Sequence, residues 1–246
     1  MNKKEAVLRA FCETVAGIKL FPYQVKFLND CLNHDRIVGV FSRQTGKTTC
    51  VGLYTLFHAV TNAGHHILII GPSQDQAFEL FNRIKNLALN SGLVAPYIQE
   101  ALMTRIEFTN GSIITARTAG DTGDRIRGKT VHVAIEEEAE LIKDDVEGEV
   151  IMPMLLTTQG KVIKIGTPKL KNHLYSSLNS PRWKAHKVQW NECPLVTEEF
   201  IAEQKARLTD MQFRQEYMAE FVEEADSYFS ESLIQTCISE HKMVKL

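Results

Sequence analysis

Short runs of apolar and β-branched residues alternate along the chain with longer segments in which apolar residues recur at helical spacing. The runs at 37–41, 66–70, 131–135 and 161–165 predict buried strands, and the segments 48–60 and 74–89 predict helices. Alternation of this kind implies right-handed crossovers and a mainly parallel, twisted sheet with helices on both faces. The fold class that we predict is therefore α/β.

Two segments depart from this alternation. Residues 105–108 and 112–116 flank Asn110-Gly111, a strong signal for an antiparallel hairpin. After Trp190, the segments 197–208 and 210–223 predict two helices, with Thr197 and Asp210 as their N-caps. We therefore predict a core of residues 1–190 and a small helical lid or linker of residues 191–246.

Composition limits the class of protein. The chain has 246 residues, of which 44% are apolar, enough for one sizeable core. A formal net charge of −2 argues against a globally basic nucleic-acid binder, although it leaves room for a local basic track. The cysteines are scattered without a C-x-x-C pair, which predicts free thiols rather than a zinc site or disulfides, at positions Cys12, Cys31, Cys50, Cys193 and Cys237.

Targeting signals are also missing from the sequence. No apolar run approaches the roughly 20 residues of a membrane helix, and residues 1–7 lack the apolar stretch of a signal peptide. We therefore expect a cytosolic protein with no membrane partner.

The segment between the first predicted strand and the first predicted helix has the features of a phosphate-binding loop. Backbone N–H groups and the helix N-terminus attract phosphate oxygens in this setting. Gly46 allows close approach, Lys47 supplies charge for the terminal phosphates, and the Thr48 hydroxyl can ligate Mg²⁺. The strict pattern begins with glycine, where this chain has Phe41. The predicted ATP-binding segment is Ser42, Arg43, Gln44, Thr45, Gly46, Lys47, Thr48 and Thr49.

Three acidic residues, Glu136, Glu137 and Glu138, follow the predicted strand 131–135. Open α/β sheets bind their ligands at the carboxyl ends of strands, so one carboxylate can hold Mg²⁺ and the next can activate water. Successive strand side chains point to opposite faces, and we assign Glu136 to the metal and Glu137 to the water. A register shifted to Glu137 and Glu138 is an open alternative, as is an acidic helix start.

Together these motifs resemble the ATPase (motor) domain of the terminase large subunit of tailed double-stranded DNA viruses. The run Ser-Arg-Gln-Thr-Gly-Lys-Thr-Thr is similar to the phosphate loop of that family, which also tolerates loss of the first glycine. The resemblance covers about residues 20–235 and implies a P-loop NTPase fold of the additional-strand, catalytic-glutamate type. Cofactors would be ATP and Mg²⁺.

The resemblance also implies a nucleotide-base contact. The run Leu20-Phe21-Pro22-Tyr23-Gln24 is similar to the adenine-contacting segment of the family, which makes Tyr23 a stacking candidate and Gln24 a candidate for the adenine edge. The alternative is that Pro22 starts a helix and Tyr23 packs in the core.

Further catalytic candidates come from two other motifs. Arg125-Ile126-Arg127-Gly128 resembles a segment from which an arginine reaches the nucleotide of a neighbouring subunit, so Arg127 is the first candidate and Arg125 the second. Arg43 is a rival that would act in cis, and each arginine could instead form a surface ion pair. Residues 164–169 resemble the coupling motif of the family, in which Thr167 would sense the γ-phosphate.

The function that the resemblance implies is ATP hydrolysis that powers translocation of double-stranded viral DNA into a procapsid. Its partners would be DNA, the portal protein, the small terminase subunit and other copies of this chain in a ring, in the host cell cytoplasm rather than the mature virion. No later aspartate cluster follows, so we expect no nuclease domain or nuclease activity. The basic groups available for DNA are Arg83, Lys85, Lys161, Lys164, Lys169 and Lys171.

Three other functions compete with this one. A helicase-like remodelling ATPase would need a second motor domain, for which 246 residues leave no room. A nucleotide-binding switch with negligible turnover would need no water-activating carboxylate. A small-molecule kinase would need an acceptor-binding lid, for which no motif is evident.

Overall fold

The computed structural model describes residues 2–128, 130–169 and 171–222. Cys237 and the predicted lid beyond residue 222 lie outside the described residues. Within them, eight strands form one sheet in the order β3-β4-β5-β2-β6-β7-β1-β8. All neighbouring pairs are parallel except β3–β4 and β4–β5. The strands are β1 Arg36–Phe41, β2 His66–Gly71, β3 Ile98–Ala101, β4 Arg105–Phe108, β5 Ile113–Thr118, β6 Val133–Glu137, β7 Lys161–Gly166 and β8 Lys184–Val188.

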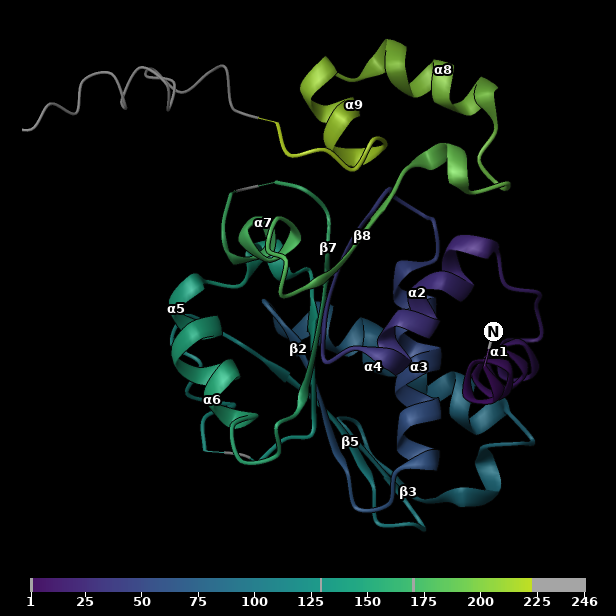
Figure 1. Cartoon of the computed structure of the whole chain (residues 1–246), viewed down its shortest axis with the longest axis vertical. Coiled ribbons are helices and arrows are strands. Elements are labelled where there is room, and N and C mark those ends of the chain that lie inside the picture. The colour runs from purple at the N-terminus through teal and green to yellow at the C-terminus, as the bar shows by residue number, and fades with distance from the viewer. Residues whose placement is uncertain (1, 129, 170, 223–246) are drawn as a thin grey trace, which may run out of the picture.

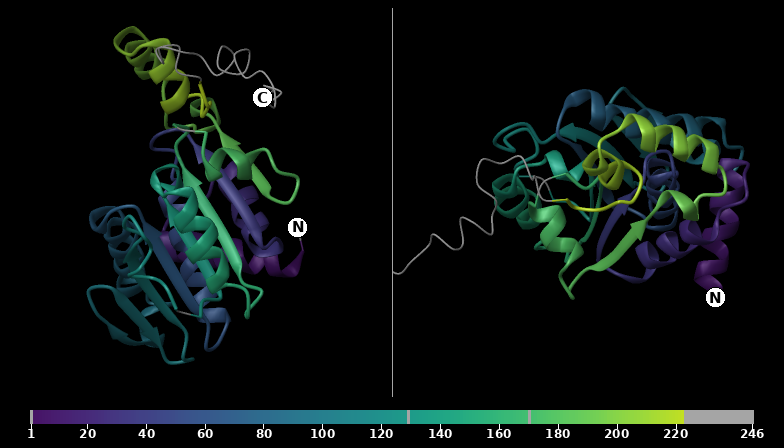
Figure 2. Two further views of the ribbon diagram at one scale, coloured as in Figure 1. Left: turned by 90° about the vertical axis from the view of Figure 1, so that its left-hand side faces the viewer. Right: turned by 90° about the horizontal axis from the view of Figure 1, so that it is seen from above.

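Helices cover both faces of this sheet (Figures 1 and 2). One face carries α1 Lys3–Ala16, α2 Pro22–Asn33, α3 Lys47–Thr61 and α4 Gln74–Asn90, and the other carries α5 Asp144–Val146, α6 Met152–Met154 and α7 His173–Leu178. A π-helical turn, Glu147–Ile151, joins α5 to α6, and short 3₁₀ turns lie at Ala95–Tyr97, Ala139–Leu141 and Trp190–Glu192. The α/β architecture predicted from the sequence is confirmed.

The hydrophobic core lies on the two faces of the sheet. Ile135 and Ile163 belong to the larger cluster, which packs under α1–α4, whereas Ala134 and Val162 belong to the cluster under α5 and α6. The alternation along β6 and β7 therefore decides which helical layer each side chain meets. The same rule applies to the acidic residues at the end of β6.

Strand β6 ends two residues later than predicted. It spans Val133–Glu137 rather than 131–135, because the parallel ladder with β7 continues through the acidic residues, pairing Glu136 with Lys164 and Glu137 with Ile165. Glu138 follows in the left-handed region with φ of 48°. Glu136 and Glu137 are thus strand residues with opposed side chains, and Glu138 lies in the turn that leaves the sheet.

The predicted hairpin is confirmed at Asn110-Gly111. Strands β4 and β5 pair antiparallel, and the Gly111 amide donates to the Phe108 carbonyl at 2.8 Å. Gly111 has φ of 79°, which glycine adopts without steric cost. Among the described residues, the cysteines Cys12, Cys31, Cys50 and Cys193 are buried free thiols, as predicted. No helix in the described part of the chain has the length and apolar character to cross a bilayer.

The C-terminal part of the described chain forms two helices that lie beyond the carboxyl ends of the strands (Figure 1). Helix α8 spans Glu198–Arg207, and the predicted N-cap Thr197 accepts from the Phe200 amide. Helix α9 spans Asp210–Glu216, but its N-cap is Thr209 rather than Asp210. It ends earlier than the predicted residue 223, because the chain turns through Ala219, which has φ of 50°.

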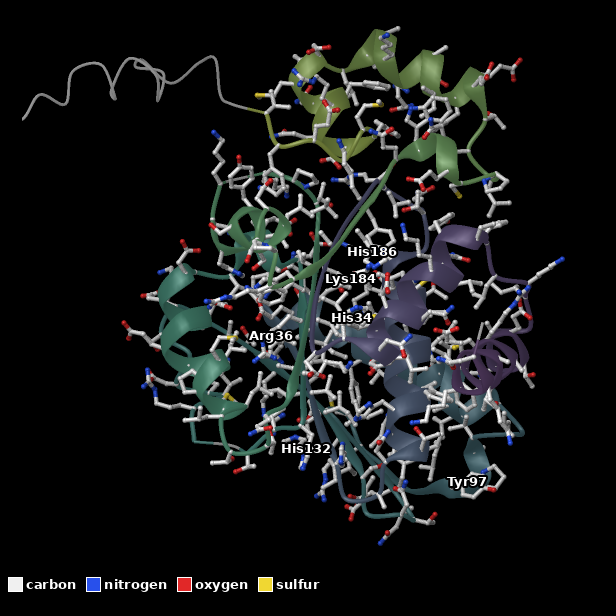
Figure 3. All side chains as sticks on the ribbon, viewed as in Figure 1. His34, Arg36, Tyr97, His132, Lys184 and His186 are labelled. Atoms are coloured by element: carbon white, nitrogen blue, oxygen red, sulfur yellow. The ribbon has the colours of Figure 1, made fainter. Side chains whose placement is uncertain are left out.

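A group of histidines lies at the amino ends of the strands, opposite α8 and α9 (Figure 3 labels His132). His58 Nε2 is 3.0 Å from His65 Nδ1, and the His65 ring stacks on His132 at 4.2 Å between centroids. Burial lowers the pKa of His58 to about 4, and positive charge at His65, Lys161 and His132 acts in the same direction. His58 is therefore neutral in the folded protein at pH 7.

This lowered pKa predicts acid lability. The folded state takes up its His58 proton at lower pH than the unfolded state, so the contribution of His58 to stability is complete above pH 6.5 and is lost as the pH falls towards 4. Between pH 7.5 and pH 5 we expect the titration of His58 to lower the free energy of unfolding by about 2 kcal/mol. Urea unfolding at both pH values measures this decrease. In His58→Gln the decrease should be smaller by the contribution of His58. Identical decreases in the parent protein and the variant would contradict the role given to His58.

Candidate active site

The segment between β1 and α3 forms a tight loop. Gln44 and Gly46 have left-handed φ values of 58° and 82°. The Thr45 hydroxyl donates to the Ser42 carbonyl at 2.7 Å, which closes the loop on itself. A Cβ at Gly46 would lie 2.6 Å from Gln24 Nε2, so a side chain here would have to displace the Gln24 amide and would also be strained by the left-handed φ. The loop leads into α3 at Lys47, and this geometry suits a bound phosphate.

A pocket of about 530 Å³ opens over this loop. Its walls come from the loop, the start of α3, helix α4 and the carboxyl ends of β6 and β7. The lining residues are Phe41, Ser42, Arg43, Gln44, Gly46, Lys47, Thr48, Thr49, Glu79, Arg83, Glu138, Thr167 and Lys169. The structure thus brings most of the predicted phosphate loop together with Thr167 and one of the three acidic residues.

The loop meets the acidic end of β6 across β7, which lies between β1 and β6. Lys47 Nζ lies 3.0 Å from Glu138 Oε1, and the Thr48 hydroxyl donates to Glu137 Oε1 at 3.1 Å. Burial opposes the charge on Lys47, but the carboxylates of Glu137 and Glu138 outweigh it and raise the Lys47 pKa. The amine is therefore a permanent cation on the pocket wall.

The two carboxyl groups beside this cation differ electrostatically. Burial raises the pKa of Glu137 to about 7, although Lys47 counteracts it, and Glu137 Oε2 has no hydrogen-bond partner among the described residues. Burial acts to raise the pKa of Glu138, but the neighbouring Glu140 carboxyl group and the charge of Lys47 bring that pKa below its ordinary value. Glu138 is therefore an ionised group on the pocket wall, and Glu137 is a buried group behind Thr48.

Glu136 lies on the other face of the sheet. It is fully buried, and its basic neighbours are Lys164 and His173, whose Nδ1 is 3.7 Å from Glu136 Oε2. The metal role predicted for Glu136 does not fit this position, because strand alternation turns its side chain away from Thr48. The alternative register, with Glu137 and Glu138 at the phosphate loop, fits the geometry.

The segment predicted to contact adenine packs against the phosphate loop. Pro22 is the first residue of α2, and the buried Tyr23 stacks on Phe21 and donates its hydroxyl to the Thr45 carbonyl at 2.7 Å. The side-chain Oε1 of Gln24 accepts from the Phe21 backbone amide at 2.9 Å. Neither Tyr23 nor Gln24 lines the pocket. Tyr23 therefore has the packing role that the sequence left open, and a stacking role does not fit its burial.

Comparison with known proteins decides the family. A family model described as the N-terminal part of the T4likevirus-type terminase large subunit matches residues 38–236. The chain belongs to this family. The terminase large subunits of Thermus phage G20c and Thermus virus P23-45 are each 27% identical to it, over 85% of this chain and 50% of their own length. The terminase chain thus spans about half the length of the curated relatives it matches.

Solved structures agree with this assignment. The large terminase ATPase domain of Thermus phage P74-26 superposes with a TM-score of 0.75 at 25% identity, covering 85% of this terminase chain and 97% of that domain. The large terminase of bacteriophage HK97 has a TM-score of 0.73 at 16% identity, over 90% and 56% of the two chains. The large terminase of another thermophilic bacteriophage, solved in complex with ADP, has a TM-score of 0.69 at 12% identity, over 83% and 54%.

The three candidate arginines of this terminase lie in different surroundings. Arg43 lines the pocket and forms a two-pronged ion pair with Glu216 of α9, with Nη2 at 3.1 Å from Oε1. The Arg43 amide also donates to the Glu216 carbonyl at 3.0 Å. Arg125 and Arg127 are exposed and lie outside the pocket, and the nearest carboxylate to Arg127 is Asp124 at 3.9 Å. Arg43 is thus the one of the three that reaches this pocket in cis.

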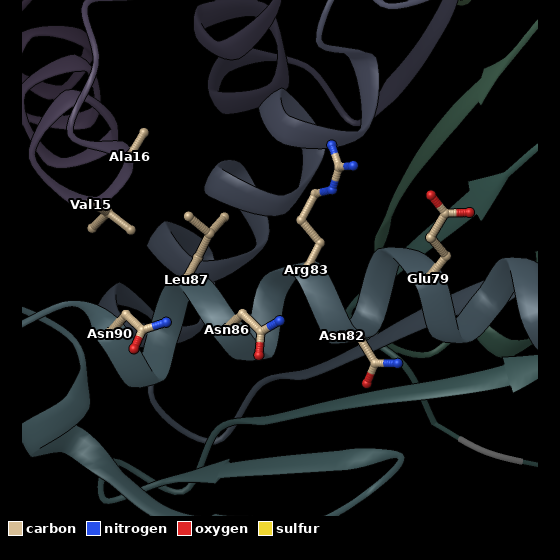
Figure 4. Close-up of a pocket in the computed structure, with 8 residues that line it drawn as sticks. All are labelled: Val15, Ala16, Glu79, Asn82, Arg83, Asn86, Leu87 and Asn90. Carbon is tan, nitrogen blue, oxygen red and sulfur yellow. The ribbon is translucent and has the colours of Figure 1, made fainter.

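Two residues of α4 in the terminase pocket were not predicted as nucleotide-site candidates. Arg83 Nη1 donates to Thr49 Oγ1 at 3.3 Å, and Glu79 lies close enough to Glu137 to oppose its ionisation. Figure 4 shows both side chains on the same side of α4, at one end of a neighbouring groove between α4 and the end of α1. The helical spacing predicted α4, but only the order of the sheet places it beside the phosphate loop.

Two of the basic residues proposed for DNA contact are buried in this terminase. Lys161 Nζ donates to the Cys31 carbonyl at 2.5 Å, and Lys164 Nζ donates to Glu147 Oε1 at 2.8 Å and to Ser177 Oγ at 3.0 Å. Their amines are committed to internal partners, so these two lysines do not fit a DNA contact.

Proposed function

We propose that this chain hydrolyses ATP with Mg²⁺ and acts as the motor domain of a large terminase, driving translocation of double-stranded DNA into a procapsid. The observation that carries the proposal is the meeting of Lys47 with Glu138, and of Thr48 with Glu137, at one pocket over a phosphate-binding loop. A cation for the terminal phosphates and a carboxylate for the attacking water are the groups that such a reaction requires.

The residues present suit Mg²⁺. Hard divalent cations prefer oxygen ligands, and the Thr48 hydroxyl and the Glu137 carboxylate offer them side by side. Glu137 Oε2 is buried without a partner among the described residues, which is costly unless an ion or water satisfies it. We assign Thr48 and Glu137 to the metal and its water shell. When bound, Mg²⁺ would neutralise charge on the phosphate oxygens.

The water-activating role then belongs to Glu138. Its ionised carboxylate lines the pocket, whereas Glu137 is held behind Thr48. In the reaction, a water oxygen forms a bond to the γ-phosphorus while the bond to the β–γ bridging oxygen breaks. ADP leaves with that electron pair, and the water proton passes to Glu138. Lys47 stabilises the negative charge on the γ-phosphate oxygens, and we assign a contact with them to Thr167, a buried residue that lines the pocket.

The proposed partners are inferred from membership of the terminase large subunit family, and not from contacts of this chain. Membership of the terminase large subunit family supports double-stranded DNA, the portal protein, the small terminase subunit and a ring of copies as partners. The exposed position of Arg127 outside its own pocket is compatible with delivery to the pocket of a neighbour. The host cell cytoplasm is the compartment where such a motor would act.

Substitution of Lys47 tests the nucleotide site. Lys47→Ala removes the cation from the pocket wall, and charged hydrogen bonds contribute about 1.5–3 kcal/mol each. We expect ATP affinity to fall about 10- to 100-fold, with a matching loss of phosphate release at subsaturating ATP. Titration of a fluorescent ATP analogue measures the binding.

The matched control is Lys19→Ala, which removes an exposed lysine from the loop before α2. It should bind ATP as the parent protein does. Unchanged affinity in Lys47→Ala would remove the assignment of the phosphate loop and, with it, the proposed function.

A further inference from the structure

The basic side chains that line the pocket over the phosphate loop differ in whether they have a carboxylate partner. Lys47 and Arg43 each pair with a glutamate. Arg83 and Lys169 also line the pocket, and neither forms an ion pair with any residue that the structure describes. A nucleotide triphosphate is an anion, so the cations without a protein partner are the ones most available to it.

Arg83 and Lys169 reach the pocket from different elements. Arg83 Nη1 donates to Thr49 Oγ1 at 3.3 Å, and Thr49 lies in the first turn of α3. Lys169 follows β7, and its positive charge acts on the Glu138 carboxylate. Lys169 therefore lies on the side of the proposed water-activating group, whereas Arg83 lies beside the helix N-terminus that faces a bound phosphate.

Helix α4 presents the Arg83 side chain to this pocket. Glu79 is one turn earlier on the same face and also lines the pocket, but no ion pair joins the two side chains in the described part of the chain. Figure 4 shows the Arg83 side chain extending from α4 on the side opposite to Asn82. A guanidinium has five N–H donors. The bond to Thr49 uses one of them, which leaves donors for phosphate oxygens.

We propose that Arg83 is a nucleotide-binding residue whose guanidinium contacts the α- or β-phosphate oxygens, which ATP and ADP share. This inference rests on the proposed function, because it takes the phosphate loop as the nucleotide site. Lys47 and Thr167 are assigned to the γ-phosphate, and Arg83 contacts Thr49 instead of either of them. A planar guanidinium can bind two phosphate oxygens at once. The nucleotide contact replaces the DNA contact that the sequence suggested for Arg83.

Arg83→Gln removes the charge and keeps a polar side chain. We expect the affinities for fluorescent ADP and for a fluorescent, non-hydrolysable ATP analogue to fall by the same factor, about 10- to 100-fold, as for one charged hydrogen bond. At saturating ATP, kcat should stay within about threefold, because the contact is the same before and during the reaction. Arg83→Lys restores the charge without the two-pronged geometry, so it should recover part of the affinity.

Lys85→Ala is the matched control, because Lys85 is another basic residue of α4 that was suggested for DNA. Its amine donates to the Leu102 carbonyl at 2.9 Å, and it does not line the pocket. This variant should bind both nucleotides as the parent protein does. Arg83 is exposed, so Arg83→Gln should melt at the parent temperature without nucleotide and gain less from added ADP. A merely structural role would instead lower the melting temperature without nucleotide.

Each other outcome contradicts the inference. Unchanged nucleotide affinity in Arg83→Gln would overturn it, and a loss of affinity for a fluorescent DNA duplex alone would return Arg83 to a DNA contact. An equal nucleotide loss in Lys85→Ala would indicate a general effect of charge. A loss for ATP but not ADP would place Arg83 on the γ-phosphate.

Lys47→Ala, measured in parallel, tests the proposed function separately. If Lys47→Ala keeps its nucleotide affinity, the assignment of the phosphate loop fails. If Lys47→Ala loses affinity and Arg83→Gln does not, only the inference about Arg83 fails.

Discussion

Glu138→Gln is expected to bind ATP normally and to lose about 10²–10⁴ in kcat, the usual contribution of a positioned general base. Glutamine keeps the size of the side chain and its contact with Lys47 but cannot take a proton from water. Glu138 lines the pocket with its pKa lowered, so at pH 7 the parent protein has the base in its active, ionised form. Single-turnover phosphate release, together with titration of a fluorescent ATP analogue, separates the chemical step from binding.

Two neighbouring glutamates provide matched controls on the same strand. Glu137→Gln should weaken Mg²⁺ binding and so raise the Mg²⁺ concentration needed for half-maximal activity, because Glu137 accepts from the Thr48 hydroxyl at 3.1 Å and is assigned with it to the metal. Glu136→Gln should keep the catalytic rate, because Glu136 is buried on the opposite face beside Lys164. A pure loss of chemistry in Glu137→Gln, with Glu138→Gln still active, would restore the register in which Glu137 activates the water.

Arg127→Ala is expected to leave ATP binding by the isolated chain unchanged and to lower turnover about 10³- to 10⁵-fold in the assembled motor, the range known for arginine fingers. Arg127 is exposed and has its nearest carboxylate at 3.9 Å, so its removal costs the fold little. In the parent protein, specific activity should rise steeply with protein concentration or on assembly with the portal. The variant should lack this rise.

A mixing experiment distinguishes an arginine supplied by a neighbour from one supplied in cis. Arg127→Ala and Glu138→Gln chains are each inactive, but in a mixed ring some pockets combine an intact Glu138 with an intact neighbouring Arg127, so activity should return. A mixture of Arg43→Ala with Glu138→Gln is the control. If Arg43 acts in cis, no pocket in that mixture is complete. Absence of recovery in the first mixture would rule out the trans role of Arg127, and Arg125→Ala tests the second candidate in the same way.

Much of the fold was predictable because it depends on local patterns. Buried parallel strands are continuous apolar runs, so β1, β2 and β7 were predicted within one residue of their ends. The phosphate loop was predictable because it requires Gly46 and Lys47 between a strand and a helix. Helix α1, by contrast, was not predicted, although Asn2 caps it with a reciprocal contact to Glu5.

What the sequence could not supply was the lateral order of the strands. The neighbours of β2 are β5 and β6, and this order, set by tertiary packing, brings Glu79 and Arg83 of α4 to the phosphate loop. The end of β6 differs from the predicted end for a related reason. Glutamates are poor strand formers, but Glu136 has a buried lysine beside it on β7, and this pairing extends the strand. The assignment of metal and water roles depended on where that strand ends.

The contact between Arg43 and Glu216 gives α9 an influence on events at the triphosphate. A ligand that draws the Arg43 guanidinium into the pocket weakens the ion pair between Arg43 and Glu216 of α9. Because coupling between two sites is reciprocal, a force that pulls α9 away from Arg43 changes the affinity of the pocket for that ligand. One arginine, Arg43, thus lines the nucleotide pocket and also pairs with Glu216 of α9. Force on the outer helices would then be felt as a change in nucleotide affinity.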